Sequence, residues 1–146
     1  MTTIAYKNGI IACDKQGTWY NQASKAPFKA IVTEDVVYLI TGVLATGLRF
    51  IEYLQGGQEG KPPKIKDTTI YEFDRNTGKL NVWESRHISF PIVDKIWADG
   101  SGGQFAIGAM AMGATPEQAV RIAIKYDVYT GGGVQSWSSN RAKKRK

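Results

Sequence analysis

The second residue of the chain combines a reactive group with a position that can activate it. The sequence begins Met1-Thr2-Thr3, and an initiator methionine is normally removed when a residue as small as threonine follows. Removal of Met1 would give Thr2 a free α-amine beside its hydroxyl. An α-amine has a pKa of about 7.7–8.0, against about 10.4 for lysine, so much of it is an unprotonated base at neutral pH. Thr2 could then be a nucleophile activated by its own amine, although a Met-Thr-Thr start is also common in ordinary proteins.

Other residues with reactive groups fit ordinary structural roles when each is taken alone. Asp14 follows an apolar run and fits a turn at the end of a strand. Lys29 fits a solvated surface lysine. Ser101 lies in the run Asp-Gly-Ser-Gly-Gly and Thr130 precedes three glycines, so either hydroxyl fits a helix N-cap or a turn. Only their order and spacing along one chain can distinguish a site from these alternatives.

The positive charge of the chain is concentrated at its end. Five of the 19 Lys and Arg lie in the last six residues, and the remaining 14 nearly balance the 13 Asp and Glu, so most of the net charge of +6 belongs to this end. We therefore expect a single domain over residues 1–137 and a basic, disordered tail over residues 138–146. The nearly neutral body argues against a nucleic-acid partner, although the tail leaves binding of an acidic partner open.

The chain has one cysteine, Cys13, and one histidine, His87. A single cysteine excludes an internal disulfide and fits a reducing cytoplasm. One cysteine and one histidine are too few ligands for a typical zinc site. Cys13 is expected to be buried and His87 to be a solvent-facing strand residue, so neither a metal nor a cofactor is expected. We find no signal-peptide pattern and no run of about 18 apolar residues, and we expect a cytoplasmic protein that does not contact the membrane.

Short strands and tight turns dominate the first part of the chain. Thr3–Tyr6 and Gly9–Asp14 are predicted to pair around an Asn-Gly turn, because both of those residues tolerate a positive φ. Phe28–Val32 and Val36–Thr41 are predicted to form a second pair. From Val43 to Leu54 the apolar residues recur at helical spacing, which predicts a helix.

The second part contains strands followed by helices. We predict, in order, a hairpin, a short strand, two helices and a last strand: Thr69–Phe73 with Leu80–Trp83, Lys95–Ala98, Gln104–Met112, a helix opening at Thr115, and Val134–Trp137. Thr115 begins a capping box, with proline at the first helical position and glutamine at the third. Paired strands with segregated helices indicate a layered α+β fold rather than a repeated βαβ unit.

Six features in this order resemble the proteasome β-type subunits, and in particular their short bacterial HslV-like and phage-encoded branch. These proteins are N-terminal threonine hydrolases. The resemblance runs from Thr2 to about Trp137 and rests on the following segments: Thr2-Thr3-Ile4, Gly9–Asp14, Lys29, Ile40-Thr41-Gly42, Asp99–Gly103 with its Gly-Ser-Gly-Gly, and Asp127–Gly132. Thr18 and Asn21 follow at the spacing of the family's substrate-lining segment. Thr130 stands where the family usually has serine, which keeps the hydroxyl.

The resemblance implies a four-layer αββα sandwich of the Ntn-hydrolase type and a role for each matched residue. Thr2 would be the nucleophile, and the Gly42 N–H would form the oxyanion hole. The residues around the nucleophile would be Asp14, Lys29, Ser101, Asp127 and Thr130, with Lys25 as the alternative to Lys29. The pocket beside the scissile bond would be lined by Thr18, Ile40 and Leu44, and the last two suggest an apolar substrate side chain.

The activity implied is that of a threonine peptidase which cleaves peptides or unfolded protein in a ring-shaped homo-oligomer. An ATP-dependent unfoldase partner, and an origin in a bacterial host or a phage, are further expectations from the resemblance. The alternative is an inactive structural or assembly protein, of phage type, that keeps the fold. This alternative follows if Met1 is retained, because Thr2 then has no free amine. A nucleic-acid binder that uses the basic tail is a third, weaker interpretation.

Overall fold

The computed structural model describes residues 2–19, 22–26, 29–85 and 87–140. Our expectations for Met1, Asn21, Phe28 and the stretch 141–146 fall outside these residues. Over the described part, the chain forms these elements in order: β1 (Thr3–Lys7), β2 (Ile10–Asp14), β3 (Gln16–Trp19), β4 (Gln22–Lys25), β5 (Ala30–Val32), β6 (Val36–Gly42), α1 (Leu44–Gln55), β7 (Thr68–Asp74), β8 (Leu80–Trp83), β9 (Ser89–Ile92), β10 (Ile96–Gly100), α2 (Gly103–Ala111), α3 (Pro116–Tyr126) and β11 (Val134–Ser138).

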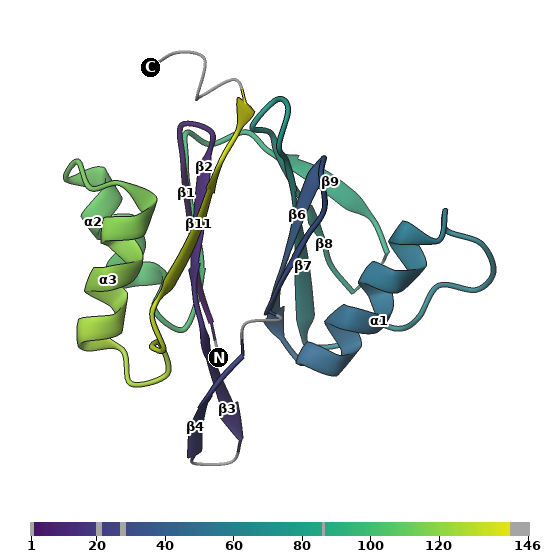
Figure 1. Cartoon of the computed structure of the whole chain (residues 1–146), viewed down its shortest axis with the longest axis horizontal. Helices are drawn as coiled ribbons and strands as arrows, with labels where there is room; N and C mark the ends of the chain where they lie inside the picture. The colour runs from purple at the N-terminus through teal and green to yellow at the C-terminus, as the bar shows by residue number, and fades with distance from the viewer. Residues whose placement is uncertain (1, 20–21, 27–28, 86, 141–146) are drawn as a thin grey trace.

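Two antiparallel sheets lie face to face, and helices cover their outer faces (Figure 1). One sheet has the strand order β10-β1-β2-β11 and the other β5-β6-β7-β8-β9. Helices α2 and α3 pack on the first sheet, and α1 packs on the second. This arrangement is the four-layer αββα sandwich, so the predicted α+β class is confirmed.

Local sequence signals account for several of these elements. Asn8 and Gly9 have φ values of 52° and 73°, as a two-residue turn between β1 and β2 requires. At the start of α3, Thr115 Oγ1 accepts the Gln118 N–H at 3.2 Å, and Gln118 Oε1 accepts the Thr115 N–H at 2.9 Å. The predicted capping box is therefore confirmed. No helix within the described ranges is long and apolar enough to cross a bilayer.

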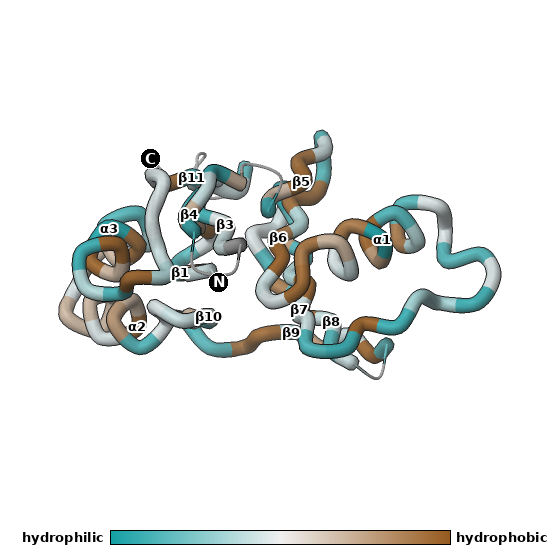
Figure 2. The backbone as a smooth tube through the Cα atoms, turned by 90° about the horizontal axis from the view of Figure 1, so that it is seen from below, coloured by the Kyte–Doolittle hydropathy of each residue, from teal (hydrophilic) through white to brown (hydrophobic). Residues whose placement is uncertain are grey.

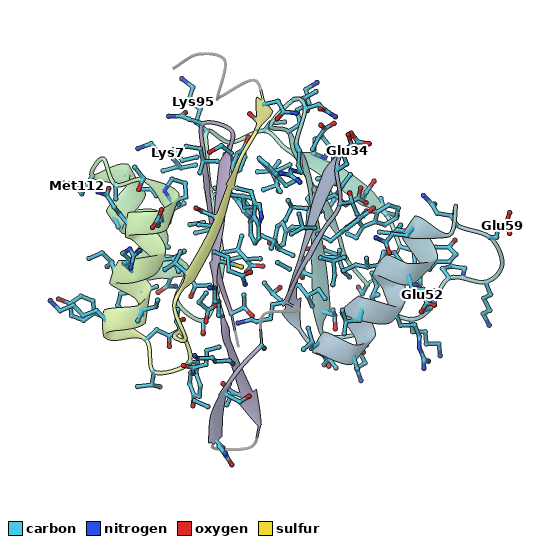
Figure 3. All side chains as sticks on the ribbon, viewed as in Figure 1. Lys7, Glu34, Glu52, Glu59, Lys95 and Met112 are labelled. Atoms are coloured by element: carbon cyan, nitrogen blue, oxygen red, sulfur yellow. The ribbon has the colours of Figure 1, made fainter. Side chains whose placement is uncertain are left out.

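The two central strands of the first sheet, β1 and β2, are buried on both faces, and the two faces carry residues of different size. Ile4 and Ile11 point toward the second sheet, where they pack in one core with residues of β6, β7 and β8. Ala5 and Ala12 point the other way, and their small side chains let α2 and α3 approach the sheet closely. Side chains fill the space between the sheets, whereas Glu52 and Glu59 project outward (Figure 3). The loop that follows α1 is largely hydrophilic (Figure 2).

Three strands were not predicted from the sequence. The hairpin β3–β4 extends beyond the sandwich (Figure 1), and all four residues of β4 are exposed. Strand β4 therefore lacks the alternation of buried and exposed residues by which a strand is recognised. A hydrogen bond from the Ala26 N–H to the Lys15 carbonyl, 2.6 Å long, closes the base of the hairpin. The third strand, β9, contains Pro91 and lies at the edge of its sheet, where a missing N–H is tolerated.

The last strand ends later than expected. β11 includes Ser138, one residue past the boundary at Trp137. Ser139 is buried and its N–H donates to the Gly9 carbonyl at 2.9 Å, while the Asn140 N–H donates to the Arg75 carbonyl at 2.6 Å. Residues 138–140 are thus attached to the turns at one end of the sandwich, and the rest of the expected tail lies outside the described residues.

The prediction for His87 was wrong, whereas Cys13 is buried as expected. His87 lies in a loop, is half-buried and has a φ of 57°. Its Nε2 lies 2.6 Å from the Pro63 carbonyl oxygen, and its ring centroid lies 5.7 Å from that of Phe50. The aromatic contact and the carbonyl fix the imidazole over α1, and neither partner is close to His87 in sequence.

Removing the capping hydroxyl of α3 should lower stability without affecting the rest of the fold. We expect Thr115→Ala to reduce the free energy of unfolding by about 1 kcal/mol, because the N–H of Gln118 loses its acceptor. Urea unfolding followed by circular dichroism measures this difference. Gln104→Ala, at an exposed position near the start of α2, is the matched control and should change stability little. Equal effects of the two substitutions would contradict the capping argument.

Candidate active site

Asp14, at the end of β2, is fully buried and accepts hydrogen bonds from several segments. Its Oδ1 accepts the Thr3 N–H at 3.0 Å and pairs with Lys29 Nζ at 3.0 Å. Its Oδ2 accepts the Gly131 N–H at 3.1 Å and, at 3.4 Å, the Gln16 N–H. A buried charge is tolerated only when it is paired and hydrogen-bonded, and Asp14 meets both conditions.

The structure brings Lys29, and not Lys25, to this carboxylate. The Lys29 side chain is only 5% exposed, and its Nζ also donates to the Gln16 carbonyl oxygen. After β4, the Lys29 N–H donates to the Ala26 carbonyl at 3.2 Å. Lys25 lies on β4 and is exposed. Of the two lysines that the sequence left open, Lys29 is the one that contacts Asp14, and its role in a site stays a prediction.

Thr2 immediately precedes β1 and is buried, with 5% of its surface exposed. Its carbonyl packs directly against Gly100, where a side chain would overlap the Thr2 carbonyl oxygen. Gly100 also has a φ of 93°, in the left-handed region that favours glycine. The glycine that begins the Gly-Ser-Gly-Gly segment is thus required for Thr2 to take its place beside β10.

A cluster of hydroxyl groups surrounds the carboxylate of Asp127 next to the start of β1. Asp127 Oδ2 accepts the Ser101 hydroxyl at 2.6 Å and the Thr130 hydroxyl at 2.5 Å. Thr130 Oγ1 lies 2.7 Å from Thr3 Oγ1, and because the Thr130 proton points to the carboxylate, Thr3 is the donor. Partial burial raises the pKa of Asp127, but the hydrogen bonds from Ser101, Thr130 and the Tyr129 N–H outweigh it and hold this pKa below its usual value.

Thr2 and Lys29 lie together on the wall of a cavity of about 550 Å³. The same wall contains every residue that the resemblance assigned to the oxyanion hole and the substrate pocket, namely Gly42, Thr18, Ile40 and Leu44. Among the described residues, Ser101, Asp127 and Thr130 are not part of this wall. They lie behind it, bonded to one another and to Thr3.

The cavity is mainly apolar, with a few polar groups. Ile40, Leu44 and Leu48 supply apolar surface, and Leu44 and Leu48 recur at one helical turn on α1. Thr18 lies on the same wall, and its Oγ1 is buried without a hydrogen-bond partner among the described residues. Pockets that bind small ligands or side chains commonly combine an apolar wall with a few such groups.

Gly42 ends β6 on the wall of this cavity and can only be glycine. Its φ is 97°, and a side chain there would overlap the backbone carbonyl oxygen of Asp67. The next residue is also fixed, because the Val43 N–H donates to Thr68 Oγ1 at 3.3 Å. The backbone at this end of β6 therefore has one conformation, which suits it to present a peptide group at a defined position.

The structure adds residues to the site that the sequence analysis did not select. Thr3 joins the hydroxyl cluster, and Ser24, Val43 and Leu48 line the cavity. Leu48 could have been found from its helical spacing to Leu44, and Thr3 from the alternation of a strand. Ser24 could not, because the hairpin that carries it was not predicted. No group of three or more His, Cys, Asp or Glu in the described part of the chain could hold a metal ion.

The comparisons with known proteins agree with this geometry at the level of fold. No protein-family model matches the chain, and no curated protein matches it. Among solved structures, it is similar to the eukaryotic HslV of Trypanosoma brucei, with a TM-score of 0.70, 18% identity, and coverage of 93% of this chain and 97% of that one. The chain has the HslV fold.

Two structures of BPH from Thiobacillus denitrificans are similar to the same extent. The free protein gives a TM-score of 0.68 at 18% identity, covering 93% of this chain and 95% of that one. The second structure, BPH in complex with epoxomicin, gives 0.66 at 19% identity, with 93% and 96% covered. Because the identity is below 20%, the likeness is one of fold over nearly the full length of each chain.

The lowered pKa of Asp127 makes a prediction about stability and pH. A carboxyl whose folded-state pKa is depressed contributes stability above its unfolded value of about 3.9, and this contribution is lost as the pH falls through the folded-state value. We expect Asp127→Asn to lower the free energy of unfolding by about 1–3 kcal/mol at neutral pH. The difference from the wild type should narrow in acid, where the wild-type carboxyl is also neutral.

Urea unfolding at pH ~7 and at pH ~3 measures this difference. Asp94→Asn, at an exposed position in the turn before β10, is the control and should change stability little at either pH. A difference for Asp127→Asn that stays constant between the two pH values would mean that the charge of Asp127 is not what stabilises the cluster.

Proposed function

We propose that the chain is a threonine-type peptidase of the proteasome and HslV kind, with Thr2 as its nucleophile once Met1 is removed. The observation that carries the proposal is the common cavity of Thr2 and Lys29, with Lys29 held in a buried ion pair by Asp14. The HslV fold supports it, and so does the complex of the similar BPH with epoxomicin, because an N-terminal threonine is the target of epoxyketones of this type.

In the proposed reaction, the α-amine of Thr2 accepts the proton of its own hydroxyl as Oγ attacks the carbonyl carbon of the substrate. The negative charge that develops on the carbonyl oxygen is stabilised by the Gly42 N–H. The amine then gives the proton to the departing amine of the substrate, which leaves an ester on Oγ. Water hydrolyses this ester with the same amine as base. A single oxyanion donor is commonly worth about 10²–10³ in rate.

Lys29 would act through its charge. An ammonium group beside Thr2 disfavours a second positive charge, so it lowers the pKa of the α-amine and keeps that amine available as a base. The same charge favours partial negative character on Oγ. Asp14 holds Lys29 directly, because its Oδ1 contacts Lys29 Nζ, and it holds Thr2 through the N–H of the next residue, Thr3. We assign Ser101, Asp127 and Thr130 the role of positioning the terminal amine from behind the cavity.

The proposed substrate is a peptide or an unfolded protein with an apolar residue before the scissile bond. Ile40, Leu44 and Leu48 supply the apolar wall, and Thr18 lies on the same wall. We extend the proposal to a ring-shaped homo-oligomer in the cytoplasm, of bacterial or phage origin, that receives substrate from an ATP-dependent unfoldase. The HslV fold supports this extension. The alternative, an inactive structural or assembly protein, becomes the better account if Met1 is retained.

The intact mass of the purified protein tests the nucleophile directly. We expect Met1 to be absent and one epoxomicin molecule to be attached covalently after incubation. Thr2→Ala should abolish the adduct, and Lys29→Ala should slow its formation by about 10²-fold or more. The matched control is Lys25→Ala, which removes an exposed lysine of the same hairpin region and should react like the wild type.

The outcomes separate the two functions. Retained Met1 with no adduct on a folded protein contradicts the peptidase and favours the structural role. An adduct that survives Thr2→Ala contradicts the choice of nucleophile. Equal effects of the Lys25 and Lys29 substitutions contradict the role of the buried ion pair, provided that circular dichroism shows both variants folded.

The apolar wall predicts the preference of the peptidase. Fluorogenic peptides that differ only in the residue before the cleaved bond should be hydrolysed fastest with leucine or phenylalanine there. We expect aspartate at this position to lower kcat/KM at least ~10-fold, because a charged group would be desolvated without a matching charge on the apolar wall. A preference for aspartate would show that another part of the cavity receives this side chain.

A further inference from the structure

A carboxylate lies between the two sheets at the end that carries the cavity. Asp99, on β10, is opposite Ile4 in the register with β1, so both side chains face the second sheet. Its Oδ2 accepts the Tyr71 hydroxyl at 2.6 Å and the Thr41 hydroxyl at 3.4 Å. The Trp97 indole N–H donates to the Tyr71 oxygen at 3.3 Å. The carboxylate therefore joins β10 of one sheet to β6 and β7 of the other.

Packing alone does not require an acid at this position. The neighbouring side chains in the layer between the sheets are apolar, among them Ile4, Leu39 and Phe73. Asp99 is half-buried, and replacing an ionic group inside a protein by an apolar one of similar volume is often neutral or stabilising. Tyr71 stays a neutral donor to Asp99, since burial and the nearby carboxylate raise its pKa well above the usual value. A bridge of this kind fixes geometry more than it adds stability.

The two ends of the bridge lie next to the two sides of the proposed site. Asp99 directly precedes Gly100, which packs against the carbonyl of Thr2. Thr41 directly precedes Gly42, which lies on the cavity wall. Thr2 leads directly into β1 of the first sheet and Gly42 ends β6 of the second, so the distance between nucleophile and oxyanion donor depends on how the two sheets are held at this end.

We propose that Asp99 is a positioning residue, which sets the distance between Thr2 and the Gly42 peptide by bridging the sheets through Tyr71 and Thr41. The inference rests on the proposed function, because it assigns Asp99 a role in that reaction. The hydroxyl must attack while the carbonyl oxygen sits at the donor, and a displacement of about 1 Å can cost about 10²-fold in rate. Asp99 itself touches no substrate in this scheme.

The test separates positioning from stability by measuring the reaction of the full chain with epoxomicin. The first-order rate constant at saturating inhibitor reports positioning, and the half-saturating concentration reports binding. We expect Asp99→Leu and Tyr71→Phe to lower the rate constant about 10-fold or more, with little change in the half-saturating concentration. Asp99→Asn, whose carbonyl oxygen can still accept the Tyr71 hydroxyl, should restore the rate to within about threefold of the wild type.

Leu80→Ala is the control for general damage to the same layer. Leu80 is buried between the sheets and pairs with Phe73, toward the end of β7 remote from Gly42. This substitution should lower the melting temperature and leave the rate constant unchanged. Asp99→Leu should instead lower the rate constant and change the melting temperature little.

Each outcome bears on one proposal or on both. If the wild type reacts and Asp99→Leu and Tyr71→Phe react at the same rate, the positioning role is wrong and the proposed function stands. If the rate constant falls in proportion to the melting temperature across all variants, Leu80→Ala included, the effect is structural and the inference is overturned. If Asp99→Leu does not fold, Tyr71→Phe decides alone. A wild type that forms no adduct overturns the proposed function and this inference with it.

Discussion

The buried carboxylate of Asp14 is the constraint on which the site depends. It joins the first strand, the lysine after the hairpin and the glycine-rich loop before β11 through direct hydrogen bonds. A carboxylate in this position must keep its partners, because leaving a buried charge unpaired costs about 3–5 kcal/mol. The location of Lys29 and the path of the chain at Thr3 therefore follow from one acid. Thr2, one residue earlier, is placed beside the lysine as a consequence.

The sandwich gives three carboxylates three different tasks at the same end of the molecule. Asp14 pairs with a lysine, Asp127 gathers hydroxyl groups behind the first strand, and Asp99 connects the two sheets. Each has at least one donor from a distant part of the chain, so each fixes a different degree of freedom of the site. The cavity itself remains mostly apolar and has few polar groups left for a substrate. This division lets a small domain hold a polar site without an unpaired charge in its core.

Much of the fold could be predicted because its signals are local. The Asn-Gly turn, the helical spacing within α1 and the capping box at Thr115 each depend on residues within a few positions of one another. The sandwich itself and the role suggested for Asp14 came from the resemblance, since no single motif in the chain specifies them, whereas Thr2 was a candidate nucleophile from its position behind Met1. Signals failed where a segment had no pattern, as in the exposed strand β4. They also failed at His87, whose partners are distant in sequence.

The sequence by itself determined most of the elements, which of their faces are apolar, and the short list of groups able to react. Only the tertiary structure decided which of those groups meet. Lys25 and Lys29 are equivalent as residues, and the return of the hairpin brings one of them to Asp14. Asp99 received no role until its partners Tyr71 and Thr41 were placed opposite it. The physical reason is that turns and caps are satisfied within a few residues, whereas a buried charge is satisfied by whatever the packing of two sheets brings within about 3 Å.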